Sequence, residues 1–197
     1  MRDTVYYFIF NGLSDWEAAL ALAEINTSKA YTVQTVALSS GPVITAAGLR
    51  LTPDLVLSEL NEARAAAFIV PGGPLWEEGG GRPVDGTVVR LAEAGVLTAF
   101  ICGGTLVAAR AGLVSNRRFT SNMPGYVELF VPDFDPGDRY VLDDFAVTDR
   151  RVVTASAVGQ VEFARDVLRE LGIYDEPGLQ EWFALFKHGT VPARYTS

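Results

Sequence analysis

The 197-residue chain contains very little cysteine or histidine: one of each, Cys102 and His188. A single cysteine cannot form a disulfide within the chain, so nothing indicates an oxidising compartment, and we expect a cytoplasmic protein. One cysteine and one histidine are also too few ligands for a tetrahedral zinc site. We therefore expect neither a metal nor another cofactor.

Positive charge is scarce as well, with 16 basic against 24 acidic residues and a net charge of -8. Nucleic-acid binding needs a basic face, and an acidic surface disfavours an anionic membrane. No apolar run reaches the roughly 18 residues of a membrane span. The first run, Val5–Phe10, is too short for a signal peptide. We expect a small-molecule substrate rather than a nucleic acid or a membrane.

What the chain does contain is an alternation of apolar strands and helical segments. The predicted strands are Val5–Phe10, Tyr31–Leu38, Ala65–Val70, Val96–Ile101, Tyr140–Leu142, Phe145–Thr148 and Val152–Thr154. The predicted helices are Glu17–Ile25, Val84–Glu93, Thr105–Ala111, Val158–Leu171 and Gln180–Lys187, and Val43–Ile44 with Leu49–Leu51 predicts a small hairpin. The pattern predicts one α/β domain, with a mostly parallel sheet between two helical layers.

Two of the predicted strands end in glycine-rich turns. Val70 is followed by Pro71-Gly72-Gly73, and Ile101 by Cys102-Gly103-Gly104. Ligands of such sheets bind at the carboxyl ends of the strands, so both turns are candidate site elements. A cysteine on a tight turn between strand and helix stands clear of the sheet, and the helix N-terminus favours its thiolate. We expect a lowered pKa for Cys102 and a nucleophilic role.

Each candidate residue also has a purely structural interpretation. Cys102 is open to interpretation as a small buried core residue, although its flanking strand, glycines and helix favour function. A phosphate-binding turn is a weaker alternative, since the glycine spacing and lysine of phosphate loops are absent. Ser14 and Glu17 have the spacing of a helix capping box, and the alternative role of Glu17 is proton transfer.

Three further positions have the same ambiguity. Gly72 and Gly73 either permit a tight turn or present backbone donors to an oxyanion. Trp76 follows that turn, either as a pocket wall beneath a mobile lid or as part of an ordinary surface loop. His188 lies at the end of a predicted helix, where a cation complements the helix dipole; this interpretation outweighs a catalytic one.

Four stretches together resemble the ThiJ/PfpI superfamily, within the class I glutamine amidotransferase-like fold. They are Asp15-Trp16-Glu17; Ile69-Val70-Pro71-Gly72-Gly73; Ala99-Phe100-Ile101-Cys102-Gly103-Gly104-Thr105-Leu106 with Ala111-Gly112-Leu113; and Val153-Thr154-Ala155-Ser156. The resemblance covers nearly the whole chain, 1–197, as a single domain. It implies a flavodoxin-like sandwich, a nucleophilic Cys102 touched by Glu17, an oxyanion hole of amides around Gly72, Gly73 and Gly103, and a homodimer.

One departure from the family pattern bears on activity. Catalytic members often place a histidine directly after the cysteine or beyond the next strand, and this chain has Gly103 and Asn122 there. Asn122 is therefore a candidate pocket residue together with Trp76. Peptidase or glutaminase activity lacks its usual histidine, so proton transfer falls to Glu17 or to water.

Three functions remain open at this point. The first is a cysteine-dependent enzyme on a small carbonyl or amide-like substrate, of hydrolase, glyoxalase/deglycase or isocyanide-hydratase type. The second is a redox or stress sensor, because an accessible thiolate oxidises readily. The third is a chaperone-like module whose Cys102 turn is idle. The first hypothesis is preferred.

Overall fold

The structure describes residues 3–142 and 144–192. In the computed structural model, seven strands form one sheet in the order β5-β2-β1-β6-β7-β9-β8. The strands are β1 (Thr4–Phe8), β2 (Thr32–Ala37), β5 (Leu55–Val56), β6 (Ala65–Val70), β7 (Leu97–Ile101), β8 (Ala146–Asp149) and β9 (Val152–Ala155). All neighbours are parallel except β8 and β9, which pair antiparallel. Two short strands, β3 (Val43–Ile44) and β4 (Arg50–Leu51), form the predicted hairpin.

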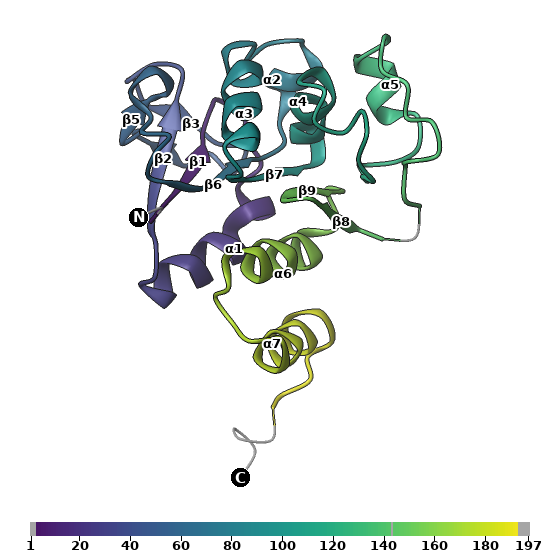
Figure 1. Ribbon diagram of the computed structural model, residues 1–197. Coiled ribbons are helices and arrows are strands. Elements are labelled where there is room, and N and C mark those ends of the chain that lie inside the picture. Colours follow the sequence, from purple (N-terminus) through teal and green to yellow (C-terminus); the bar gives the residue numbers. More distant parts are fainter. Residues whose placement is uncertain (1–2, 143, 193–197) are drawn as a thin grey trace.

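Helices cover both faces of the sheet (Figure 1). The α-helices are α1 (Asp15–Ser28), α2 (Pro74–Glu77), α3 (Pro83–Glu93), α4 (Thr105–Arg110), α5 (Tyr126–Phe130), α6 (Gln160–Leu171) and α7 (Glu176–His188); 3₁₀ turns lie at Leu57–Glu59 and Cys102–Gly104. Helices α1 and α6 pack together on one face, with α7 outside α6, while α2, α3 and α4 cover the other. None of these described helices is both long and apolar enough to cross a bilayer.

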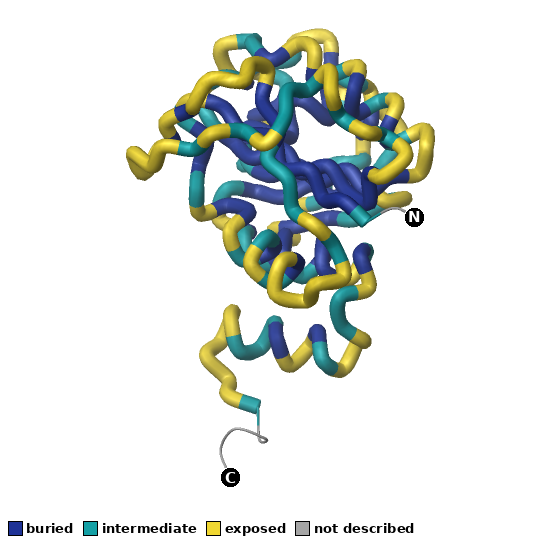
Figure 2. Tube along the Cα trace, turned by 90° about the vertical axis from the view of Figure 1, so that its left-hand side faces the viewer, coloured by how far each residue is buried: buried dark blue, intermediate teal, exposed yellow. Residues whose placement is uncertain are grey.

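The central strands are buried on both faces. Every residue of β1, β6 and β7 is buried, and Figure 2 shows these strands as the dark centre of the molecule. A parallel sheet between two helical layers requires such continuous apolar strands. The predicted fold class, a mostly parallel sheet in a three-layer α/β sandwich, is confirmed.

One predicted strand is wrong. Tyr140–Leu142 does not join the sheet, in which β8 is the edge strand, and forms only a single bridge, between Tyr140 and Phe119. Its backbone instead pairs across Phe119, whose N–H donates to Arg139 and whose carbonyl accepts from Val141.

Several helix boundaries differ from the prediction for local reasons. Helix α7 begins at Glu176 rather than Gln180, because the Asp175 carboxylate caps it by accepting from the Gly178 N–H and Pro177 fits the first turn. Helix α6 begins at Gln160, two residues later than predicted, with Gly159 as its N-cap residue. The short helices α2 and α5 were not predicted, since four or five residues show no measurable periodicity.

A bidentate ion pair joins the two helices that cover β7. The Arg110 guanidinium at the end of α4 donates to both Asp85 carboxylate oxygens on α3, at 3.1 and 2.7 Å. The Arg110 side chain is only 5 % exposed. Removing one partner of a buried pair leaves a charge without compensation, which costs about 3–5 kcal/mol.

We expect Asp85→Ala to lower the free energy of unfolding by about 3 kcal/mol, because Arg110 stays buried and unpaired. The matched control is Glu62→Ala, which breaks the exposed Arg90–Glu62 pair and should cost about 1 kcal/mol or less. Urea unfolding measures both. Equal effects of the two variants would contradict this role of the Asp85–Arg110 pair.

Candidate active site

Cys102 lies on a strained turn at the carboxyl end of β7. Its φ of 56° is in the left-handed region, which costs a non-glycine residue about 1–2 kcal/mol. The Thr105 hydroxyl holds the turn by donating to the Cys102 carbonyl at 2.6 Å, and it lies 2.6 Å from the Ser121 hydroxyl. The half-buried sulfur is thereby held in place at the edge of the sheet.

The turn after β6 reaches Cys102 only because it has no side chain at Gly72. A Cβ on Gly72 would lie 2.6 Å from the Cys102 Cβ, 2.8 Å from its Sγ and 2.9 Å from Glu17 Oε1. The same point is therefore close to both the sulfur and the carboxylate. The next residue, Gly73, has a φ of 149°, which side chains rarely adopt. Both glycines allow the β6 turn to close against the sulfur.

Glu17 brings a carboxylate into this contact from the first turn of α1. The residue is 1 % exposed, and its Oε2 accepts from the Gly72 N–H at 2.6 Å. Ser14 makes no side-chain capping bond to the helix, so the capping-box alternative is wrong. Oε1 has no hydrogen-bond partner at ordinary distance among the described residues; it faces the Cys102 thiol, and the Ser14 hydroxyl also influences the carboxyl group.

The expected oxyanion hole needs one correction. The Gly72 N–H is not free for substrate, because the Glu17 carboxylate already accepts from it. The Gly73 N–H has no acceptor among the described residues, and the Gly103 N–H faces the sulfur. Gly73 N also lies 3.5 Å from the point that a Cβ on Gly103 would occupy. Gly73 and Gly103, without Gly72, are the backbone donors available beside Cys102.

Asn122, expected as a pocket residue, contacts the sulfur directly. Its Nδ2 donates to Cys102 Sγ at 3.4 Å, and its Oδ1 accepts from the Ala157 N–H at 2.9 Å. The amide orientation is therefore fixed, with the donor toward the sulfur. His188, the chain's single histidine, ends α7 in an exposed position beside Phe183 and does not reach this contact.

The pKa of Cys102 is opposite to the sequence-based expectation. Burial of the thiol, together with the negative charge of Glu17, raises the pKa of Cys102 to about 12, although the Asn122 amide and the Gly103 N–H act in the other direction. Burial also raises the pKa of Glu17, partly offset by the Gly72 N–H and the Cys102 thiol. The buried carboxyl group and the half-buried thiol retain a shared proton, because ionising both would place two negative charges together.

Trp76 supports the site from behind. It is 1 % exposed on α2, and its Nε1 donates to the Pro71 carbonyl at 2.7 Å. Its ring also lies against Gly103 and beneath the Arg110 guanidinium. Trp76 thus braces both glycine-rich turns instead of lining an open mouth.

Sequence reasoning missed Tyr126, which lies near the sulfur on α5. Its hydroxyl donates to Glu77 Oε1 at 2.6 Å, which connects α5 to α2. Burial and the Glu77 contact raise the pKa of Tyr126, so the phenol stays protonated. The turn residues Asn122-Met123-Pro124-Gly125 precede α5 and were the one signal in the sequence for this segment.

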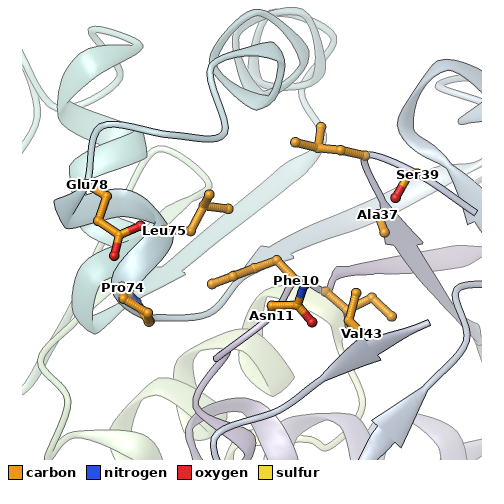
Figure 3. Close-up of a pocket in the computed structure, with 10 residues that line it drawn as sticks. Phe10, Asn11, Ala37, Ser39, Val43, Pro74, Leu75 and Glu78 are labelled. Atoms are coloured by element: carbon orange, nitrogen blue, oxygen red, sulfur yellow. The ribbon is translucent and has the colours of Figure 1, made fainter. Parts of the chain in front are cut away.

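A separate hollow lies on the other side of the β6 turn. It measures about 300 Å³, and Figure 3 shows Phe10, Pro74 and Leu75 among the side chains around it. A Cβ on Gly73 would meet the Phe10 ring at 2.7 Å, whereas one on Gly72 would meet Cys102. The two glycines therefore separate this hollow from the sulfur.

Comparison with known proteins agrees with this geometry. Residues 3–170 match the model of the DJ-1/PfpI family. The chain belongs to the DJ-1/PfpI family. It is similar to the uncharacterized protease YoaZ of Bacillus subtilis (strain 168), 32 % identical over 190 residues, or 93 % of this chain and 90 % of that protein. It is also 30 % identical, over 68 % of this chain and 69 % of the relative, to the glutathione-independent glyoxalase DJR-1.2 of Caenorhabditis elegans.

Solved DJ-1/PfpI structures share the whole fold. A ThiJ/PfpI family protein from Bacillus anthracis superposes with a TM-score of 0.88 at 30 % identity, covering 96 % of this chain and 93 % of that one. The DJ-1 superfamily protein Atu0886 from Agrobacterium tumefaciens gives 0.85 at 26 % identity, covering 93 % and 98 %. The family expected from the four sequence stretches is confirmed.

The buried carboxylate makes stability depend on pH. Because the pKa of Glu17 is raised in the folded protein, ionisation favours the unfolded chain, and stability is lost as pH rises from the ordinary value of 4.5 through the raised one. We expect Glu17→Gln to have little effect on Tm at pH 4 and to raise it at pH 8, by about 2–4 °C for each kcal/mol gained.

Differential scanning calorimetry at the two pH values measures this effect. The control is Glu93→Gln, which changes an exposed carboxylate at the end of α3 and should shift Tm equally at both values. A Glu17→Gln variant that is less stable than the native chain at pH 8 would show that the ionised carboxylate stabilises the fold.

Proposed function

We propose that this DJ-1/PfpI protein is a cysteine-dependent enzyme that acts on a small carbonyl or amide-like substrate. The observation that carries the proposal is the contact of one thiol and one buried carboxylate across Gly72. Burial raises the pKa of the carboxyl group, which makes Glu17 a stronger base than an exposed carboxylate, and the neighbouring sulfur is an intrinsically strong nucleophile.

The reaction would begin with the thiol proton. Glu17 accepts the proton from Cys102 Sγ as the sulfur attacks the electrophilic carbon, so an S–C bond forms while the C=O π pair moves onto oxygen. The Gly73 and Gly103 N–H groups would stabilise that oxyanion. Protonated Glu17 then returns its proton to the oxyanion or to the departing group.

Two outcomes follow from this adduct, depending on the substrate. If a group leaves, the adduct is a thioester, and water releases the acid and restores the thiol. If none leaves, as with an aldehyde, the product is a hemithioacetal, the first adduct that glyoxalase-type chemistry needs. The glyoxalase named among the relatives supports testing the second class first, and the relative named a protease supports testing hydrolysis.

The raised pKa of Cys102 counts against a redox sensor. Oxidation by peroxide requires the thiolate, and burial with the Glu17 charge disfavours it. In an enzyme the same proton is removed only when the electrophile is in place. We also propose that the protein is a cytoplasmic homodimer, and sedimentation velocity tests whether it is a dimer.

The test is turnover with a small panel: methylglyoxal, a nitrophenyl ester and an alkyl isocyanide. We expect turnover of one class by the native chain, loss of about 10³-fold or more in Cys102→Ser, and a loss of about 10²–10⁴-fold in kcat for Glu17→Gln. Glu93→Gln is the control with unchanged kcat. Turnover that survives in Cys102→Ser would contradict the proposal.

A further inference from the structure

A small hollow lies beside Asn122, between the segment after α4 and the strand ends of β8 and β9. It measures about 160 Å³, and its polar wall consists of Thr120, Ser121, Asn122, Tyr140, Asp144 and Ser156. We call it the Ser156 hollow. Ser156 is 5 % exposed, yet its hydroxyl has no hydrogen-bond partner among the described residues. A buried hydroxyl without a partner costs free energy, so an occupant that bonds to it would recover that energy.

Four large apolar side chains line the Ser156 hollow, and each is strongly exposed. They are Met123 (57 %), Leu142 (72 %), Phe145 (48 %) and Val158 (67 %). They come from three separate segments, so the fold brings them together. A grouped apolar surface around a concave site is typical of ligand binding, whereas isolated exposed apolar residues need no explanation.

Asn122 connects the Ser156 hollow to the sulfur. The same residue lines the hollow and donates from Nδ2 to Cys102 Sγ at 3.4 Å. Cys102 itself does not line the hollow, so a substrate whose electrophilic carbon lies at the sulfur would reach the hollow with a side group that passes the Asn122 side chain. An enclosed apolar cavity of about 150 Å³ accommodates a benzene ring. The Ser156 hollow has a similar volume and a mixed polar and apolar lining, so a side group of about that size fits it.

We propose that the Ser156 hollow is the substrate side-group site: it binds an aryl or branched alkyl group attached to the carbon that Cys102 attacks. The Ser156 hydroxyl bonds a polar atom on that group, and the four apolar side chains cover its apolar part. This inference rests on the proposed function, because it assigns the substrate class of the same site. It favours aryl or branched carbonyl compounds over the unsubstituted ones.

The single cysteine allows a test that does not depend on turnover. Cys102 Sγ displaces iodide from iodoacetamide and from N-benzyliodoacetamide. The preference for the benzyl reagent is the ratio of the benzyl rate constant to the iodoacetamide rate constant, divided by the same ratio for glutathione. We expect the native chain to prefer the benzyl reagent by about tenfold, the usual effect of an apolar subsite. Intact-protein mass spectrometry follows the reaction, since Cys102 is the only thiol.

Two variants with matched exposure locate the preference. Met123→Ala should reduce the preference for the benzyl reagent several-fold, whereas Leu49→Ala, at 56 % exposure on the β3–β4 hairpin, should leave both the preference and the rate with iodoacetamide unchanged. Ser156→Leu should abolish the preference by filling the hollow. An N-(hydroxybenzyl) reagent should react faster still with the native chain, and Ser156→Ala should remove that additional gain.

Each outcome decides a different claim. The side-group site would be overturned by a native preference for the benzyl reagent near one, or by a preference that Met123→Ala leaves unchanged. It would also be overturned if a second copy of the chain buries the apolar rim. That outcome would be seen as a preference that disappears with rising protein concentration. If Ser156→Leu does not fold, the effect of Met123→Ala on the preference still tests the side-group site. A strong preference without turnover of any panel substrate would contradict the proposed function and leave the side-group site supported.

Discussion

The hydrogen bond from the Gly72 N–H to Glu17 Oε2 is the contact on which the rest of the site depends. It joins the turn after β6 to the first turn of α1 at 2.6 Å, inside the protein. Because Gly72 also presses against the Cys102 side chain, the same contact fixes the carboxylate beside the sulfur. Trp76 Nε1 donates a hydrogen bond to the Pro71 carbonyl of the turn after β6. The turns after β6 and β7 and the first turn of α1 are thus tied to one another by backbone as much as by side chains.

The groups that carry the proposed chemistry lower the stability of the folded protein. A buried carboxylate, a half-buried thiol and a cysteine in the left-handed region each destabilise the native state. The fully buried strands β1, β6 and β7 offset that cost and hold the turns rigidly. Strain collected at one edge of an otherwise regular sheet is typical of a catalytic site, where it positions reacting groups before substrate arrives.

Local patterns predicted much of this molecule, and long-range contacts account for the rest. The apolar runs predicted the central strands and the position of Cys102 after β7, because a strand buried on both faces has a clear sequence signature. The pKa of Cys102 was predicted in the wrong direction, since the helix N-terminus is a local feature whereas burial and the Glu17 charge arise only from the folded chain.

The same distinction explains the remaining differences. The use of the Gly72 N–H by Glu17 joins residues 55 positions apart, which no local pattern reveals. Likewise, Tyr126 and the exposed side chains around Ser156 come together only when α5, β8 and β9 fold against the site.

The most direct test of the thiol–carboxylate pair is the pH dependence of iodoacetamide alkylation, because every event reports Cys102. The account predicts slow alkylation of the native chain near pH 7 and a rate that still rises above pH 9, since burial and the Glu17 charge raise the pKa of the thiol. In Glu17→Gln that charge is gone, so the curve should move to lower pH. A native rate that is already constant below pH 7, and that Glu17→Gln moves to higher pH, would contradict the account.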